Sequence, residues 1–366
     1  MNYKETYLQN ANTLKITESF SGVRHCKWQS PSNIALIKYW GKKDGQIPLN
    51  ASLSFTLKNA HTITEVTYSF AEHKRGIIDF NFEGKPNDMF AGRIKSYVSS
   101  MTQYLPFLNQ LQLEINSSNS FPHSSGIASS ASSMSALALC FCDMEKSLFG
   151  TLQQENEFYQ KASFLARIGS GSAARSVYGG FVGWGINELV ENSSDEVAMK
   201  LDIDSGNRLA NLKDAILITS KTKKKVSSSH GHQLMNEHPY RLARRKQADQ
   251  NFIALLNAIE TENDTDFIRI VEHEALSLHA LMLSSVPGFT LMNENSWEII
   301  NKIRKFREST GIMITFTLDA GPNVHIIYKQ IDSKNVESFI ANELLQYCEN
   351  GYWISDETGE GPKKLN

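Results

Sequence analysis

Apolar side chains that recur every three or four residues predict the main helices of this chain. One such row follows a serine-rich segment, and its members are Met134, Leu137, Phe141, Met144 and Leu148. Gly150 comes next and provides a C-terminal stop for that helix. Thr151 and Gln154 then form a capping-box pattern that opens a helix carrying Phe158 and Leu165. Further helices are predicted over residues 88–101, 231–261, 265–284 and 294–308.

Shorter apolar or alternating segments predict strands between these helices. They cover residues 33–38, 52–57, 62–70, 111–115 and 214–220, with strand character again in "VYGGFVGW". Near the end, "GIMITFTLDAGPNVHIIY" predicts a strand, a tight Gly-Pro turn and another strand. Residues 1 to about 27 show little periodicity and are typical of an N-terminal extension. The mixture predicts an α+β fold, with a domain boundary near residues 190–210, around the loop-like "VENSSDEVA".

Length and composition narrow the class of protein without assigning a function. A chain of 366 residues has room for two domains with sizeable cores. Its 37 Lys and Arg against 39 Asp and Glu leave a net charge of −2, which gives no support for nucleic-acid binding. The basic run in "SKTKKKVSSSHGH" has no interleaved aromatic residues, so its lysines are typical of a solvated face. No segment has the pattern of a signal peptide or a membrane span, so no membrane partner is expected.

The cysteines indicate a reducing compartment. None of the four, Cys26, Cys140, Cys142 and Cys348, has metal-ligand spacing. Cys140 and Cys142 fall two residues apart in one predicted helix, where the geometry for a disulfide is poor. Reduced thiols in a cytoplasmic protein are the simplest interpretation.

A segment of small residues, "NSFPHSSGIASSASSMSALAL" (residues 119–139), leads into the first predicted helix. Small side chains let a backbone approach a ligand closely, and the first N–H groups of a helix lack intrahelical partners. Such a loop suits a phosphate, and serine hydroxyls can add hydrogen bonds to phosphate or to phosphate-bound Mg²⁺. The alternative is a flexible Ser/Ala loop before a core helix, and no Walker motif is present to decide between the two.

Three other polar segments sit where apolar patterns end. "PSNIALIKYWGKKDG" places Lys38, Lys42 and Lys43 either beside a phosphate or on a solvated strand end. "GSGSAARS" either presents Arg175 to a phosphate or carboxylate, or is a plain helix-cap loop. In "TLDAGPN", Asp319 either caps a turn or acts as a base or hydroxyl-orienting group in a desolvated cleft.

Taken in order, these segments resemble mevalonate diphosphate decarboxylases, a family of the GHMP kinase superfamily. The resemblance spans about residues 30–327, and its most specific pieces are "NIALIKYWGK", "GSGSAARSVYGGFV" and "DAGPN". "FPHSSGIASSAS" is similar to the superfamily phosphate loop P-x-x-x-G-[LI]-x-S-S-A. The chain departs from the family pattern at Ser133, at Ala51 and in "SSSHGH", which lacks the Gly-Met pair typical of the family.

The resemblance implies a two-domain GHMP kinase fold with the active site in the interdomain cleft. Residues 1–27 would form the extension, 28–205 a ribosomal protein S5 domain 2-like domain with the phosphate loop, and 206–366 the GHMP kinase C-terminal domain. The implied reaction uses ATP to phosphorylate the C3 hydroxyl of mevalonate 5-diphosphate. Phosphate and CO₂ then leave, giving isopentenyl diphosphate, ADP and phosphate. A homodimer is also implied.

The resemblance further implies roles for the catalytic residues, carried over position by position. Asp319 is expected to orient or deprotonate the C3 hydroxyl, and an unperturbed aspartate is a weak base, which favours orientation. Lys38 is expected to neutralise phosphate charge or hold this aspartate, and Asn33 to position the substrate carboxylate region or this network. Arg175 is expected to grip the substrate carboxylate, together with Ser170 and Gly171.

Binding roles follow in the same way. The residues expected to hold the substrate diphosphate are Tyr39, Lys42 and Arg93. The residues expected to meet ATP are Gly126, Ala128, Ser129, Ser130 and, near the γ-phosphate, Ser228. Mg²⁺ is expected to arrive with ATP, with Ser130 as its candidate protein ligand and no cage of protein ligands.

Other functions stay open at this point. A phosphomevalonate decarboxylase would act on the monophosphate, and a mevalonate 3-kinase-like enzyme would stop at phosphorylation. Lys38, Arg175 and Asp319 argue against the 3-kinase, while Arg93 and Lys42 argue for the diphosphate. An ordinary small-molecule kinase of the superfamily should lack "KYWGK", and a non-catalytic ligand-binding homologue should have lost the aspartate.

Overall fold

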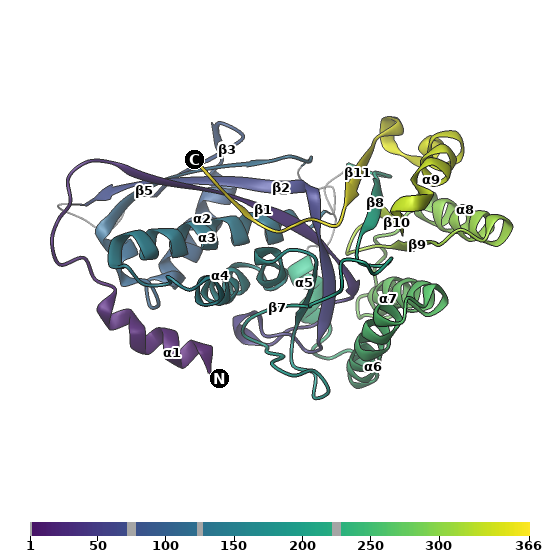
Figure 1. Ribbon diagram of the computed structural model, residues 1–366, viewed down its shortest axis with the longest axis horizontal. Coiled ribbons are helices and arrows are strands. Elements are labelled where there is room, and N and C mark those ends of the chain that lie inside the picture. The colour runs from purple at the N-terminus through teal and green to yellow at the C-terminus, as the bar shows by residue number, and fades with distance from the viewer. Residues whose placement is uncertain (1, 72–77, 123–126, 222–227) are drawn as a thin grey trace.

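The structure is a computed structural model that describes residues 2–71, 78–122, 127–221 and 228–366. Within these residues two β-sheets lie one after the other along the long axis of the molecule, each with helices packed on it (Figure 1). The chain is therefore a mixed α+β protein, as its hydrophobic pattern predicted.

The first sheet is built around two long antiparallel strands. In the part of the chain that is described, its strand order is β12-β1-β2-β5-β3-β4, with β6 paired to β2 and β7 paired to β6. The strands are β1 (Arg24–Ile37), β2 (Ser52–Phe70), β3 (Ile78–Phe82), β4 (Lys85–Pro86), β5 (Leu111–Asn119), β6 (Phe181–Trp184), β7 (Met199–Lys200) and β12 (Lys363–Leu365). The register of β1 on β2 shifts between Pro31 and Asn33 and again between Ala35 and Ile37. Such bulges bend a strand, here where it reaches the polar "KYWGK" segment.

Three helices cover one face of this sheet (Figure 1). They are α2 (Asp88–Met101), α3 (Ser129–Phe149) and α4 (Glu155–Gly169). The predicted stop of α3 is confirmed, because Gly150 adopts φ 68° and its N–H donates to the carbonyl of Lys146 at 3.1 Å. The predicted capping box is wrong. Helix α4 begins after Gln154, and the Thr151 hydroxyl instead donates to Glu145 Oε1 at 3.0 Å.

Residues before β1, expected as an extension of little periodicity, form helix α1 (Tyr3–Asn10), which packs on the first domain. Tyr7 is buried and meets Phe164 of α4 edge-on, with ring centroids 5.0 Å apart. Leu14 joins the same apolar core. A helix of eight residues is too short to display a clear period, which explains why the sequence pattern did not reveal it.

The second sheet has the order β11-β8-β10-β9 and is antiparallel throughout the described residues. Its strands are β8 (Leu212–Leu217), β9 (Ile314–Thr317), β10 (Val324–Lys329) and β11 (Trp353–Glu357). The helices of this half are α5 (Ser228–Leu234), α6 (Arg241–Glu260), α7 (Asp264–Leu283), α8 (Glu294–Thr310) and α9 (Ser333–Phe339). Helices α7 and α8 confirm the helices predicted over residues 265–284 and 294–308. The single helix predicted over residues 231–261 is wrong, because Pro239 lacks an N–H and separates α5 from α6.

The two sheets share apolar contacts. Leu53 and Phe55 of β2 belong to the same buried cluster as Phe252 of α6 and Phe267 of α7. The Asp356 carboxylate of β11 accepts hydrogen bonds at 2.7–2.8 Å from the backbone N–H groups of residues 58–60 in β2. A common apolar core and these hydrogen bonds therefore join the two sheets.

Candidate active site

A polar cleft opens where the two sheets meet, and both halves of the chain line it. In the first half of the chain, the lining residues lie just after β1, at the start of α3 and after α4. In the second half they lie in α5, in α7 and in the turn after β9. Its lining includes Lys38, Tyr39, Trp40, Lys42, Arg93, Ala128, Ser130, Ser170, Gly171, Arg175, His232 and Asp319.

A lysine–aspartate pair crosses this cleft. Lys38 is 1 % exposed, and its Nζ donates to Asp319 Oδ1 at 2.9 Å and to the carbonyl of Ala35 at 2.6 Å. Burial lowers the pKa of Lys38, and the Asp319 carboxylate partly offsets that effect. The Asp319 side chain is 27 % exposed, so it is the member of the pair that a ligand can reach.

The backbone around Lys38 is clamped from α6 and α7. The Glu274 carboxylate accepts the Lys38 N–H at 2.9 Å, and Arg244 donates to both Glu274 oxygens at 2.7 Å. Arg244 also donates to the Lys38 carbonyl at 3.1 Å, and Asn251 donates to Glu274 at 2.7 Å. Burial acts to raise the pKa of Glu274, but Arg244 and these hydrogen bonds together lower it. Hydrogen bonds therefore fix both the main chain and the side chain of Lys38.

Arg175 also lines the cleft. It lies in the short 3₁₀ segment Gly171–Val177 and is 2 % exposed. Its guanidinium donates to Ser52 Oγ at 2.6 Å and to Asn33 Oδ1 at 3.2 and 3.3 Å. Burial lowers the pKa of Arg175 to about 10, so the group stays cationic at neutral pH. Asn33 lies behind the arginine, where it also donates to Ser176 Oγ at 2.8 Å.

Tyr39 and Lys42 extend the cationic wall. The Tyr39 hydroxyl is buried and has no hydrogen-bond partner among the described residues, and burial raises the pKa of this phenol. Gly171 makes room for it, because a Cβ there would lie 2.7 Å from the Tyr39 oxygen. The Lys42 ammonium donates to Gln46 at 2.8 Å, and partial burial lowers the Lys42 pKa. A buried donor without a protein acceptor can bind a water or a ligand oxygen.

The start of α3 faces the same cleft. Ala128 occupies the N-cap with φ 43° and has no polar side chain to cap the helix. The hydroxyls of Ser130 and Ser170 lie 3.3 Å apart. Gly126 lies outside the described residues, and Ser228 is placed as the first residue of α5 without its side chain.

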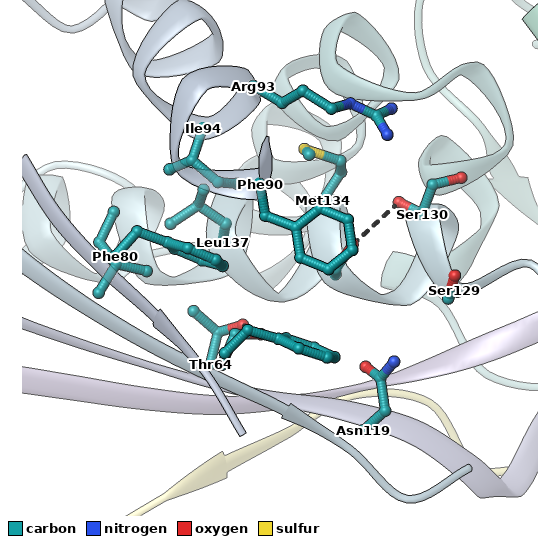
Figure 2. A pocket seen from close by; sticks show the side chains of 14 residues that line it. Thr64, Phe80, Phe90, Arg93, Ile94, Asn119, Ser129, Ser130, Met134 and Leu137 are labelled. Atoms are coloured by element: carbon teal, nitrogen blue, oxygen red, sulfur yellow. Dashed lines mark hydrogen bonds between the residues drawn. The ribbon is translucent and has the colours of Figure 1, made fainter. Parts of the chain in front are cut away.

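A second, mostly apolar pocket, called the aromatic pocket here for its three phenylalanines, adjoins the start of α3 (Figure 2). Phe80, Phe82 and Phe90 line it, with the last two rings edge-on at 5.3 Å. Figure 2 shows Ser129 and Ser130 at one end and Phe80 at the other. Ser130 and Arg93 line both the pocket and the cleft, so the two spaces adjoin at these residues.

The structure thus gathers most of the predicted site residues around one cleft and its adjoining pocket. Sequence reasoning missed Ser52, Arg244, Glu274 and His232. Glu274 had one signal, since it falls on the otherwise apolar face of its predicted helix. A carboxylate at such a position is buried and needs a partner, although the sequence does not say which.

Comparison with known families decides the relationship. The model of the diphosphomevalonate decarboxylase-like N-terminal domain matches residues 30–196, and that of the mevalonate 5-diphosphate decarboxylase C-terminal domain matches residues 215–362. The chain belongs to the diphosphomevalonate decarboxylase family. It is therefore a carbon–carbon lyase by family, and the expected GHMP kinase type of two-domain fold is confirmed.

Individual members of the diphosphomevalonate decarboxylase family agree with this assignment. The enzymes of Aspergillus fumigatus and Saccharomyces cerevisiae are each 31 % identical over 327 residues, which is 85 % of this chain and 78 % and 79 % of theirs. The Staphylococcus aureus mevalonate diphosphate decarboxylase structure is 29 % identical, with a TM-score of 0.80, covering 94 % of this chain and 99 % of that one. MDDEF in complex with MVAPP, AMPPCP and magnesium is 28 % identical, with a TM-score of 0.79, covering 94 % and 100 %.

Two further observations bear on the sequence predictions. Each of the four cysteines is a buried free thiol. No helix among the described residues is long and apolar enough to cross a bilayer.

Proposed function

We propose that this chain decarboxylates mevalonate 5-diphosphate with ATP, releasing isopentenyl diphosphate, CO₂, ADP and phosphate. One observation carries the proposal. A cationic cleft that holds the Lys38–Asp319 pair adjoins an aromatic pocket at the start of a helix, and Arg93 and Ser130 line both. Such a layout suits transfer of a phosphoryl group from a nucleotide in the pocket to a hydroxyl in the cleft.

The nucleotide occupies the aromatic pocket in this proposal. Its base packs among Phe80, Phe82 and Phe90, and its phosphates point toward Ser130 and Arg93. The uncapped N–H groups at the start of α3 and the helix dipole favour the negative charge there. Ser228 is proposed to approach the γ-phosphate from α5.

Mg²⁺ fits this arrangement as a partner of the nucleotide. Among the described residues no group of three His, Cys, Asp or Glu side chains could hold a metal ion. Mg²⁺ usually keeps several water ligands and binds substrate phosphates, and the Ser130 hydroxyl can add one protein ligand. The ion would neutralise phosphate charge.

The substrate diphosphate binds along the cationic wall. Lys42 and Arg93 supply charge, and the unpartnered Tyr39 hydroxyl supplies a hydrogen bond. Ser170 and Gly171 lie beside it and leave room for the substrate. Each charge-assisted hydrogen bond contributes roughly 1.5–3 kcal/mol, so several are needed to hold a strongly hydrated anion.

The reacting end of the substrate lies between Asp319 and Arg175. Asp319 accepts a hydrogen bond from the C3 hydroxyl and aligns its oxygen with the γ-phosphate, while Lys38 fixes the carboxylate. Phosphorylation turns a poor leaving group into a good one. When the C3–O bond breaks, positive charge develops at C3, and Asp319 stabilises it. The electrons of the C–CO₂⁻ bond then form the new C=C bond as CO₂ leaves, and Arg175 positions that carboxylate, with Asn33 holding the guanidinium.

Purified protein with ATP and Mg²⁺ tests this proposal when CO₂ and ADP are followed together. Equal release of both with mevalonate 5-diphosphate is expected, with little from mevalonate or its 5-monophosphate. ADP without CO₂ would indicate a 3-kinase, and CO₂ from the monophosphate would indicate a phosphomevalonate decarboxylase. No reaction with any of the three would contradict enzymatic function.

We also propose a cytoplasmic homodimer. The buried free thiols support a reducing compartment. Light scattering coupled to size-exclusion chromatography should give twice the chain mass of 41.1 kDa, and a value of 41.1 kDa would contradict the dimer.

A further inference from the structure

We propose that His232 is a substrate-binding residue that donates a neutral Nε2–H hydrogen bond to the substrate diphosphate. This inference rests on the proposed function, because it assigns a new contact in the same cleft. His232 belongs to α5, in a segment that otherwise contributes only Ser228 to the proposed site. Its ring lines the cleft.

The backbone fixes the tautomer of this histidine. Nδ1 accepts the N–H of Gly41 at 2.9 Å, so Nδ1 carries no proton and a neutral ring must carry it on Nε2. Gly41 is itself held in place. It adopts φ 91°, and a Cβ there would lie 2.6 Å from Leu49 Cδ1. The Gly41 N–H therefore has a defined direction, and so does the imidazole that accepts it.

The ring is also fixed by its aromatic neighbours. Its centroid lies 4.4 Å from that of Tyr39 and 4.7 Å from that of Trp40. Burial lowers the pKa of His232 to about 3, and the nearby Lys42 ammonium acts in the same direction. At neutral pH the cleft thus contains an uncharged N–H donor of fixed orientation beside a lysine.

The described part of the chain offers Nε2 no acceptor. The Tyr39 hydroxyl, a second donor on the same wall, has no partner there either. Two donors beside the Lys42 ammonium match an anion with several oxygens, which is the chemistry of a phosphate or diphosphate group. A neutral donor adds a hydrogen bond without adding repulsion toward Lys42.

Two substitutions separate ligand binding from a purely structural role. His232→Asn keeps an acceptor near the Nδ1 position for Gly41 but has no atom at Nε2. His232→Gln can place an amide donor near Nε2 but gives up the Nδ1 acceptor. We expect His232→Asn to raise KM for mevalonate 5-diphosphate about tenfold, the loss of one hydrogen bond, with KM for ATP changed less than about twofold. His232→Gln should stay within about threefold of the wild type for both.

The opposite ranking, with His232→Asn normal and His232→Gln impaired, would show that His232 only secures Gly41. Equal impairment of both variants, or no effect in either, would also overturn the proposal. His25→Asn, at an exposed position on β1, is the matched control.

Calorimetric titration with inorganic diphosphate keeps this test separate from the proposed function. Weaker diphosphate binding by His232→Asn than by His232→Gln is expected even if the wild-type enzyme proves not to release CO₂. Equal diphosphate affinities in the two variants would overturn the assignment of His232 whatever reaction the enzyme catalyses.

Discussion

At the scale of single residues, the cleft depends on a buried lysine that faces a partly exposed carboxylate. Lys38 is 1 % exposed and Asp319 is 27 % exposed at its side chain, so the lysine is held by protein while the carboxylate remains available to a ligand. In the proposed reaction the aspartate acts on the substrate, and the lysine keeps the aspartate in place.

Replacing Asp319 with asparagine should therefore affect turnover much more than binding. The amide keeps the shape but loses the charge that orients the hydroxyl and stabilises a cation at C3. We expect Asp319→Asn to lower kcat by roughly 10²–10⁴-fold. Affinities for ATP and for mevalonate 5-diphosphate, measured by calorimetry, should change little. The control is Asp202→Asn, at an exposed position. An active Asp319→Asn enzyme would remove Asp319 from its assigned role.

His232 also gives the protein a defined acid sensitivity. Its pKa falls from 6.5 to about 3 on folding, so between these values the unfolded chain binds a proton that the native protein does not. Stability must then decrease as pH falls through that window, by about 1.4 kcal/mol per pH unit. Between pH 6.5 and pH 5, the free energy of unfolding should decrease by about 2 kcal/mol more in the wild type than in His232→Gln. Denaturant unfolding at the two pH values measures this difference. Identical pH slopes would mean that the native histidine is protonated.

At the scale of elements, helices α6 and α7 act as a clamp on the end of β1. The Arg244–Glu274 pair connects two helices of the second half to the main chain of Lys38 in the first half. The sequence predicted α7 and placed Glu274 on its apolar face, but the partner of this carboxylate is about 30 residues away and could not be inferred from periodicity.

Glu274→Gln tests the clamp. The amide leaves the Arg244 guanidinium buried without a counter-charge, which should lower the free energy of unfolding by about 3 kcal/mol. Because Lys38 loses its fixed position, kcat should also fall in the variant that remains folded. Urea unfolding and steady-state rates measure the two effects, with exposed Glu298→Gln on α8 as the control. Full stability in Glu274→Gln would contradict the clamp.

Helix α1 stabilises the fold without reaching the cleft. Tyr7 packs on Phe164, and the Tyr3 N–H donates to Glu196 at 2.7 Å. Tyr7→Ala should lower the free energy of unfolding by about 3 kcal/mol through loss of buried aromatic surface. KM values and kcat should be unchanged well below the unfolding temperature, and Lys4→Ala should change neither property. A large drop in kcat at full stability would show that α1 has a role in the active site.

At the scale of the whole molecule, the reaction depends on placing segments about 280 residues apart in the sequence on opposite sides of one cleft. The sequence predicted the long helices α2, α3, α4, α7 and α8 because such helices carry their own period, but it divided the single strand β2 into two. It also predicted that Lys38, Arg175 and Asp319 are chemically relevant, through their motifs. The sequence could not predict the hydrogen bonds of Arg175 with Ser52 and Asn33, or the bond of His232 with Gly41, because tertiary packing alone creates these contacts. The domain limits at residues 28–205 and 206–366 stay a prediction, although β12 at the C-terminus pairs with β1 of the first sheet.

A crystal structure with mevalonate 5-diphosphate, Mg²⁺ and a non-hydrolysable ATP analogue tests the central claim most directly. We predict the nucleotide base among Phe80, Phe82 and Phe90, and the diphosphate beside Tyr39 and Lys42. The C3 hydroxyl should lie at roughly 2.6–3.2 Å from Asp319 Oδ, in line with the terminal phosphate. A substrate whose hydroxyl lies away from Asp319, or a nucleotide bound outside the aromatic pocket, would contradict it.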